Sequence, residues 1–208
     1  MRRALWICVA ILSLIMITVA TRRIIHLSPA AEGLDVGFAR HRFLTLAHIV
    51  PGMAFVILGP FQFVAGLRMR HPVLHRWMGR VLMILALVIG TTALIMGPQM
   101  AVGGGLETAA TFVFGTLFLF AFGKAWAAIR ARRLAEHRRW MIRGYAIGLG
   151  VATVRPIVGA FFATSRFTHL TPHDFFGVAF WLGFIISLAM GEVWIRMTAG
   201  GSQVDRGK

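Results

Sequence analysis

The sequence predicts an all-α membrane bundle of six transmembrane helices, with the N- and C-termini both cytoplasmic. Three observations lead to this prediction: the composition, the spacing of the apolar segments, and the distribution of lysine and arginine. The chain is 58% hydrophobic and only 14% charged, whereas soluble domains carry about 25% charged residues. A soluble fold of 208 residues could not bury this much apolar surface, so the lipid bilayer is the expected solvent.

Six apolar segments are long enough, or nearly long enough, to cross the hydrocarbon layer, which takes about 20 residues in a helix. They cover residues 4–20, 43–66, 77–97, 109–130, 140–164 and 174–196. We therefore expect a single integral membrane domain over residues 1–208. The first segment ends in Thr-Arg-Arg rather than in small residues, which favours a retained anchor over a cleaved signal peptide.

The basic residues predict the orientation of the helices. If the N-terminus is cytoplasmic, 16 of the 22 Lys and Arg residues fall in inner segments and five in outer segments. The remaining one, Arg155, lies within the fifth predicted helix. Because cytoplasmic loops carry an excess of Lys and Arg, this bias predicts that both termini face the cytoplasm.

Two similar stretches, HPVLHRWMGR at 71–80 and EHRRWMIRGY at 136–145, each precede a long apolar segment. Trp77 and Trp140 would lie at the membrane interface, with the arginines in the headgroup layer. The stretches arise either from a weak parallel repeat, as in some transporters, or from convergent interface chemistry. The net charge of +15 is concentrated in such clusters. The expected partners are therefore the bilayer and its anionic headgroups, not nucleic acid.

The predicted outer segments contain two helix starts and one glycine-rich turn. Ser28-Pro29 followed by Glu32 predicts a short helix on the outer surface. The stretch GPQMAVGGGLE at 97–107 predicts a flexible turn or a shallow re-entrant segment. Thr171 is expected to cap the sixth helix, with Asp174 in its first turn.

Histidines and glycines share a face on the second predicted helix and again on the fifth. With about 3.6 residues per turn, the two aligned sets are His48, Gly52, Gly59 and Gly66, and His137, Gly144, Gly148 and Arg155. One interpretation is helix packing, because glycines let backbones approach closely in lipid. The other is a flat cofactor such as haem, which would lie against the glycines and be held by histidine.

Arg155 indicates a functional site more strongly than the glycines do, because a charge within a spanning helix needs a partner or a wet cavity. The groups expected near it on the outer side, which predict an intramembrane polar site, are His48, Asp174, His169 and His173. Glu192, near the inner end of the sixth helix, is a further intramembrane polar candidate. Its expected role is a salt bridge with Arg143, Arg80 or Lys124.

Signals for familiar enzyme chemistry are absent from the sequence, and whether the protein is an enzyme stays open. VGGGLE lacks the Lys-Ser/Thr ending of a phosphate loop, and there is no H-E-x-x-H zinc motif. ATSRF lacks the glycines that flank a nucleophilic serine. With seven acidic residues in all, hydrolytic acid–base machinery is disfavoured. The single cysteine, Cys8, cannot form an intrachain disulfide.

Three motifs in a fixed order carry a family resemblance. AHIVPGMAFVILGPFQF, HPVLHRWMGRVLM and HRRWMIRGYAIGLGVATVRP resemble the small bacterial multi-pass membrane proteins of domain-of-unknown-function family 2306 (DUF2306), over about residues 43–160. The residues that match the family pattern are His48, Gly52, Gly59, Gln62, His75, Arg76, Gly79, Arg80, His137, Arg138, Trp140, Met141, Arg143 and Arg155. The resemblance implies a multi-pass protein of the bacterial inner membrane, and it implies no activity.

A looser likeness is to the six-helix b-type cytochrome reductases, which hold two haems between paired histidines of alternate helices. This likeness implies haem b as a cofactor, with His75 and His137 as one ligand pair and His48 as a further candidate ligand. The fourth predicted helix contains no histidine, so a second complete pair is missing. The likeness therefore leaves room for one haem.

Two functional hypotheses follow, together with a purely structural or assembly role as the remaining alternative. The first is a transporter, channel or accessory protein in which Arg155 and His48 form a polar site for a proton or an anion. The second is a haem-binding electron-transfer or quinone-linked membrane protein that uses His75 and His137.

Overall fold

The computed structural model describes residues 2–28 and 33–199, and every regular element in these ranges is helical. Six helical segments are long and apolar enough to cross a membrane, which confirms the predicted number and the all-α class. They are α1 (Arg2–Ile25), α3 (Arg42–Leu58) with the 3₁₀ turn η2 (Gly59–Phe63), α5 (Pro72–Met100), α6 (Gly104–Arg130), α7 (Leu134–Gly148) with α8 (Gly150–Thr168), and α9 (Pro172–Ala199). The short elements are η1 (Gly33–Asp35), α2 (Val36–Arg40) and α4 (Ala65–Arg70).

Several helix boundaries in the structure differ from those predicted from the sequence. The α5 helix begins at Pro72, because proline suits the first helical turn, where its missing N–H has no intrahelical partner. The turn predicted within residues 97–107 is confined to residues 101–103, because α5 continues to Met100 and α6 starts at Gly104. The fifth span is interrupted at Leu149, between two glycines, and continues as α8.

At the start of α9 Thr171 and Asp174 contact each other as predicted, but it is the Asp174 side chain that accepts the backbone N–H. The Asp174 carboxylate accepts hydrogen bonds from the Thr171 backbone N–H at 2.8 Å and from the Thr171 hydroxyl at 2.6 Å. This contact satisfies an N–H group that the helix cannot bond internally. The predicted helix start at Ser28-Pro29 with Glu32 falls largely outside the described residues, and beyond it η1 and α2 form a short helical segment.

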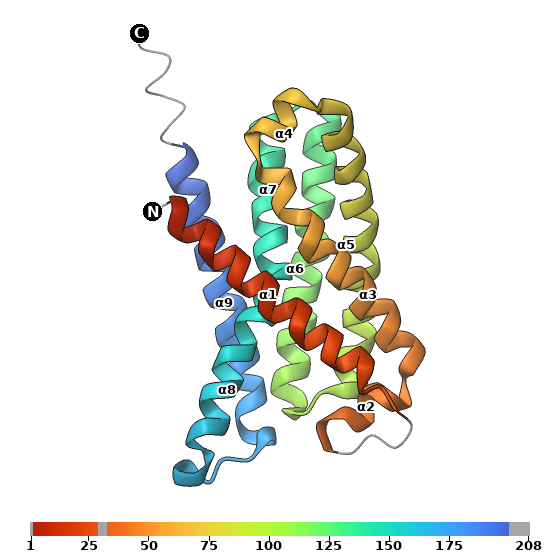
Figure 1. Ribbon diagram of the computed structural model, residues 1–208, viewed down its shortest axis with the longest axis vertical. Coiled ribbons are helices and arrows are strands. Elements are labelled where there is room, and N and C mark those ends of the chain that lie inside the picture. Colours follow the sequence, from red (N-terminus) through yellow and green to blue (C-terminus); the bar gives the residue numbers. More distant parts are fainter. Residues whose placement is uncertain (1, 29–32, 200–208) are drawn as a thin grey trace.

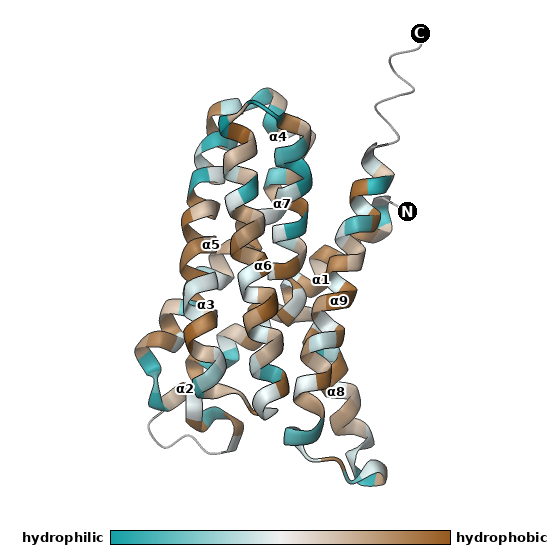
Figure 2. Cartoon of the chain, turned by 180° about the vertical axis from the view of Figure 1, so that it is seen from behind, coloured by the Kyte–Doolittle hydropathy of each residue, from teal (hydrophilic) through white to brown (hydrophobic). Residues whose placement is uncertain are grey.

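The spans pack as a bundle crossed by one oblique helix. Neighbouring contacts join α3 to α5, α5 to α6, α6 to α7, and α8 to α9, while α9 also packs against α6 and α7. Figure 1 shows α1 running diagonally across this arrangement, where it packs on α3 and α8. In Figure 2, hydrophilic residues gather towards the helix ends and hydrophobic residues along their middle.

Two ends of the molecule can be distinguished. In Figure 1 the N-terminal end of α1 and the C-terminal end of α9 lie towards the end that carries α4, and α2 lies towards the opposite end. We call these the α4 end and the α2 end. The α4 end matches the predicted inner side, although the assignment of that side to the cytoplasm stays a prediction.

Aromatic rings and glycines build the core between α3, α6 and α7. Phe55 contacts Phe118 with ring centroids 5.7 Å apart. A Cβ atom added at Gly148 would lie 2.7 Å from the Phe55 ring, and one added at Gly144 would lie 2.6 Å from the Phe122 ring. These two glycines are therefore needed for close packing, which favours the packing interpretation of the glycine face on the fifth span.

Candidate functional site

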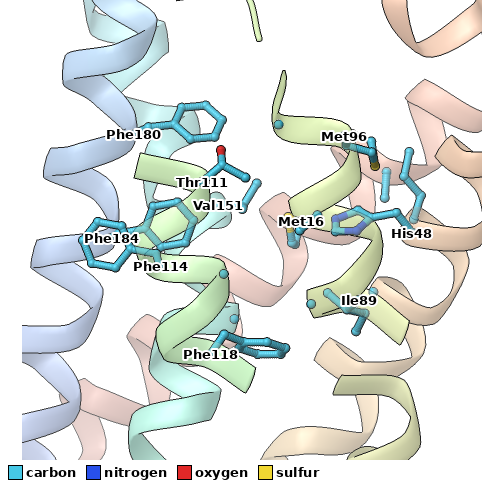
Figure 3. A pocket seen from close by; sticks show the side chains of 18 of the residues that line it. Met16, His48, Ile89, Met96, Thr111, Phe114, Phe118, Val151, Phe180 and Phe184 are labelled. Atoms are coloured by element: carbon cyan, nitrogen blue, oxygen red, sulfur yellow. The ribbon is translucent and has the colours of Figure 1, made fainter. Parts of the chain in front are cut away.

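A cavity of about 200 Å³ lies within the bundle and receives side chains from every described α-helix except α4. Its lining is mostly apolar, and six phenylalanines contribute to it: Phe38, Phe55, Phe114, Phe118, Phe180 and Phe184. The rings of Phe114 and Phe184 stack with their centroids 4.7 Å apart. Figure 3 shows Phe114, Phe118, Phe180 and Phe184 on one side of the cavity, with His48, Ile89 and Met96 on the other.

Four ionisable residues line this cavity: Arg23 from α1, His48 from α3, Glu107 from α6 and Arg155 from α8. Ionisable groups within spanning helices are costly, and they occur where they pair or face a wet cavity. The question for each group is therefore which partner it has.

Arg23 and Glu107 are both partnered within the protein. The Arg23 guanidinium forms an ion pair with Asp35 and lies 3.9 Å from the centroid of the Phe38 ring. Glu107 is only 7% exposed. Its carboxylate accepts the Gly103 backbone N–H at 2.6 Å, which fixes the short connection between α5 and α6.

Arg155 is the exception. It is partly buried, its Nε is buried, and the guanidinium makes no hydrogen bond or ion pair with any residue that the structure describes. Glu107 and Arg23 lie within electrostatic range of it, one attractive and one repulsive. A buried N–H without an acceptor costs about 1–3 kcal/mol, and more when the group is charged. Arg155 therefore presents unused donors and a positive charge at the wall of an apolar cavity.

His48 is held in place by contacts with α5, one of them with the backbone of Ile89. Its Nδ1 lies 2.9 Å from the Thr92 hydroxyl oxygen on α5. The ring points across the cavity towards Met16 of α1 (Figure 3). Arg155 and His48, which the sequence predicted to share one polar site, thus line the same cavity from different helices.

The other predicted members of the polar site lie elsewhere. Asp174 is exposed and bonds to Thr171 at the start of α9, and it is not part of the cavity lining. Glu192 accepts two hydrogen bonds from Arg143, at 2.5 and 3.2 Å, in the expected salt bridge. Neither acid therefore neutralises Arg155.

The sequence prediction missed Glu107 and Arg23 as lining residues. Glu107 falls in the stretch predicted to be a flexible turn or a shallow re-entrant segment. It is the one acidic residue in the sequence between 36 and 135, and this isolation is the signal that could have identified it. Arg23 was counted among the outer basic residues, and only the oblique course of α1 carries its side chain to the cavity.

The histidines proposed as haem ligands are near one another at the α4 end. His75 and His137 lie within electrostatic range. The His137 Nδ1 lies 2.9 Å from the Ala125 carbonyl oxygen, whereas the His75 Nδ1 is buried without a partner. Neither residue lines the 200 Å³ cavity. In residues 2–28 and 33–199, no group of three or more His, Cys, Asp or Glu side chains could hold a metal ion.

The six apolar spans and the site between them define a multi-pass membrane protein. The chain belongs to the DUF2306 family, described as predicted membrane proteins, whose profile matches residues 45–195. The match includes His48, Glu107 and Arg155, but the α1 wall of the cavity lies outside it. No curated protein and no solved structure matches the chain.

Proposed function

We propose that this protein binds a small amphipathic organic anion in the cavity, as a transporter or accessory protein of the bacterial inner membrane. The observation that carries the proposal is Arg155, whose guanidinium has no hydrogen bond or ion pair with a described residue and lines an otherwise apolar cavity. An anionic headgroup would satisfy these donors, and an apolar body would fill the rest of the space.

The cavity volume limits the size of the ligand. A cavity of about 150 Å³ with apolar walls can hold benzene, and this one measures about 200 Å³. A ring with a short side chain therefore fits without rearrangement. Longer hydrocarbon chains would have to extend out between the helices.

The charge of the site favours an anion over a cation. Arg23 is already paired with Asp35, and Glu107 is already bonded to the backbone, so Arg155 is the charged group left without a direct partner. A hydrogen bond to a charged group contributes about 1.5–3 kcal/mol. A cation would instead meet two guanidinium groups in the lining.

Binding of 3-phenylpropanoate tests this proposal, with 3-phenylpropan-1-ol as the uncharged analogue of similar size. Isothermal titration of the full chain in detergent micelles would compare native protein with Arg155→Gln. The matched control is Arg166→Gln, which removes an exposed arginine from the same helix, outside the cavity lining. We expect Arg155→Gln to weaken carboxylate binding by about 10- to 100-fold, and Arg166→Gln to leave it unchanged.

Two results would contradict the anion site. Equal affinities for the acid and the alcohol would show that charge contributes nothing, and equal losses in the two arginine variants would show that the effect is not local. If binding is found, uptake of labelled 3-phenylpropanoate into proteoliposomes distinguishes a transporter from a protein that only binds the anion.

The orientation and the lipid partner belong to the same proposal. We place the α4 end in the cytoplasm, because it carries the basic clusters that sequence analysis assigned to the inner side. Its exposed arginines include Arg68, Arg70, Arg76 and Arg80. Basic residues at that surface attract anionic headgroups by about 1 kcal/mol each.

A further inference from the structure

The hydrogen bonds around Thr92 determine which nitrogen of His48 carries the proton. The Thr92 hydroxyl lies 2.6 Å from the Val88 carbonyl oxygen and 3.1 Å from the Ile89 carbonyl oxygen, neither of which can donate. Two oxygen atoms only 2.6 Å apart repel each other unless a hydrogen lies between them, so this geometry favours a hydroxyl hydrogen directed at the Val88 carbonyl. The Thr92 oxygen then accepts from His48 Nδ1, so neutral His48 is protonated on Nδ1.

This tautomer leaves the other imidazole nitrogen as a hydrogen-bond acceptor. The Ile89 carbonyl, which also interacts with His48, lies 3.1 Å from the Thr92 oxygen that Nδ1 contacts, and no group in the described part of the chain donates a hydrogen bond to Nε2. Because His48 lines the cavity and its ring points into it (Figure 3), Nε2 is available to a ligand. The cavity thus offers a donor at Arg155 and a separate acceptor at His48.

The rest of the lining favours a flat apolar group. Phe114 and Phe184 stack on each other with an interplanar angle of 11°, and Phe180 lies beside them in Figure 3. Aromatic rings pack well against such walls in offset or edge-to-face contacts. A ring of the size allowed by about 200 Å³ would contact this wall.

We propose that the ligand is a phenolic carboxylic acid, with its carboxylate at Arg155, its ring against Phe114 and Phe184, and its hydroxyl donating to Nε2 of His48. This inference rests on the proposed function, because it adds two requirements to the same anion site. A site for any amphipathic carboxylate would need only the anionic group, whereas this site also requires a hydrogen-bond donor on the ligand. A protic group is selected because a ligand without one leaves Nε2 unpaired in an apolar cavity.

The test compares 3-(4-hydroxyphenyl)propanoate with 3-phenylpropanoate and with the 4-methoxy analogue. All three carry the same carboxylate, but only the first has a hydroxyl that can donate. In native protein we expect the phenol to bind about fivefold to tenfold more tightly than either analogue, as one neutral hydrogen bond provides. In His48→Leu this ratio should fall to about one.

Two further variants make the result specific. Thr92→Val removes the hydroxyl that fixes the Nδ1–H tautomer, so it should lower the same ratio. His71→Leu removes an exposed histidine outside the cavity and should preserve the ratio, provided that the detergent-purified variant keeps its native thermal unfolding.

The inference and the proposed function fail in different ways. Equal binding of all three acids by native protein, or a preference that survives in His48→Leu, would overturn the inference and leave the anion site standing. If native protein binds none of the three acids, both are overturned. Because the ligand comparison is made in native protein, poor folding of His48→Leu would not prevent a decision.

Discussion

Filling the cavity from Gly52 is the most direct test that it is the binding site. Gly52 lies on α3 and lines the cavity, and a Cβ atom added there would meet nothing within 4 Å. Leucine adds four carbon atoms, and if each takes the roughly 30 Å³ that one water molecule occupies in the liquid, they fill about 120 Å³. That volume is more than half of the 200 Å³ available. Gly52→Leu should therefore exclude a ring-sized ligand.

The same substitution should not damage the fold. Leucine is favoured over glycine within a helix by about 0.5–1 kcal/mol, and the new side chain occupies space that is empty. We expect unchanged or slightly higher thermal stability together with at least a tenfold loss of 3-phenylpropanoate affinity. The assays are isothermal titration and thermal unfolding of the detergent-purified protein.

Gly123→Leu is the matched control for this experiment. Gly123 lies on α6, its Cβ would also meet nothing within 4 Å, and it does not line the cavity. It should show a similar change in stability and native affinity. Native affinity in Gly52→Leu would refute the location of the site, and a marked loss of stability would refute the claim that the space beside Gly52 is open.

Two further predictions concern other parts of the molecule. Glu192→Gln should lower the free energy of unfolding by about 1 kcal/mol, because it removes the charge from a two-bond, partly exposed pair with Arg143. Glu136→Gln, which loosens the exposed 3.5 Å pair with Arg133, should have a smaller effect in the same denaturation assay. The haem hypothesis predicts a Soret band and a sharp reduced α-band when protein expressed with haem supplied is oxidised and then reduced with dithionite. A flat visible spectrum would eliminate haem and leave the anion site as the function to pursue.

Helix α1 contributes to the cavity lining, although the family match begins only at residue 45. Met16 and Arg23 belong to α1 and line the cavity together with residues of the matched region. Within the described ranges α1 packs mainly on α3 and α8, so it forms one wall of the cavity. A chain without α1 would leave this wall open to lipid.

The sequence alone determined the features that depend on local pattern. Hydrophobic length predicted six spans because each helix must satisfy its backbone and cover about 30 Å of hydrocarbon by itself. The contact between Thr171 and Asp174 was predictable because the two residues are three apart, within one helical turn. The Arg143–Glu192 pair was predictable as one of three options, since both residues lie near the same end of their spans.

Only the tertiary structure decided where the site lies and what completes it. The sequence placed His48 and Arg155 on the same side of the membrane, but it could not show that both would line one cavity while Asp174 stays outside its lining. It also could not show that Glu107 and Arg23 would line the cavity, because that depends on the short α5–α6 connection and the oblique course of α1. Periodicity fixes which residues share a helix face, whereas the packing of helices against one another decides which faces meet and where space remains between them.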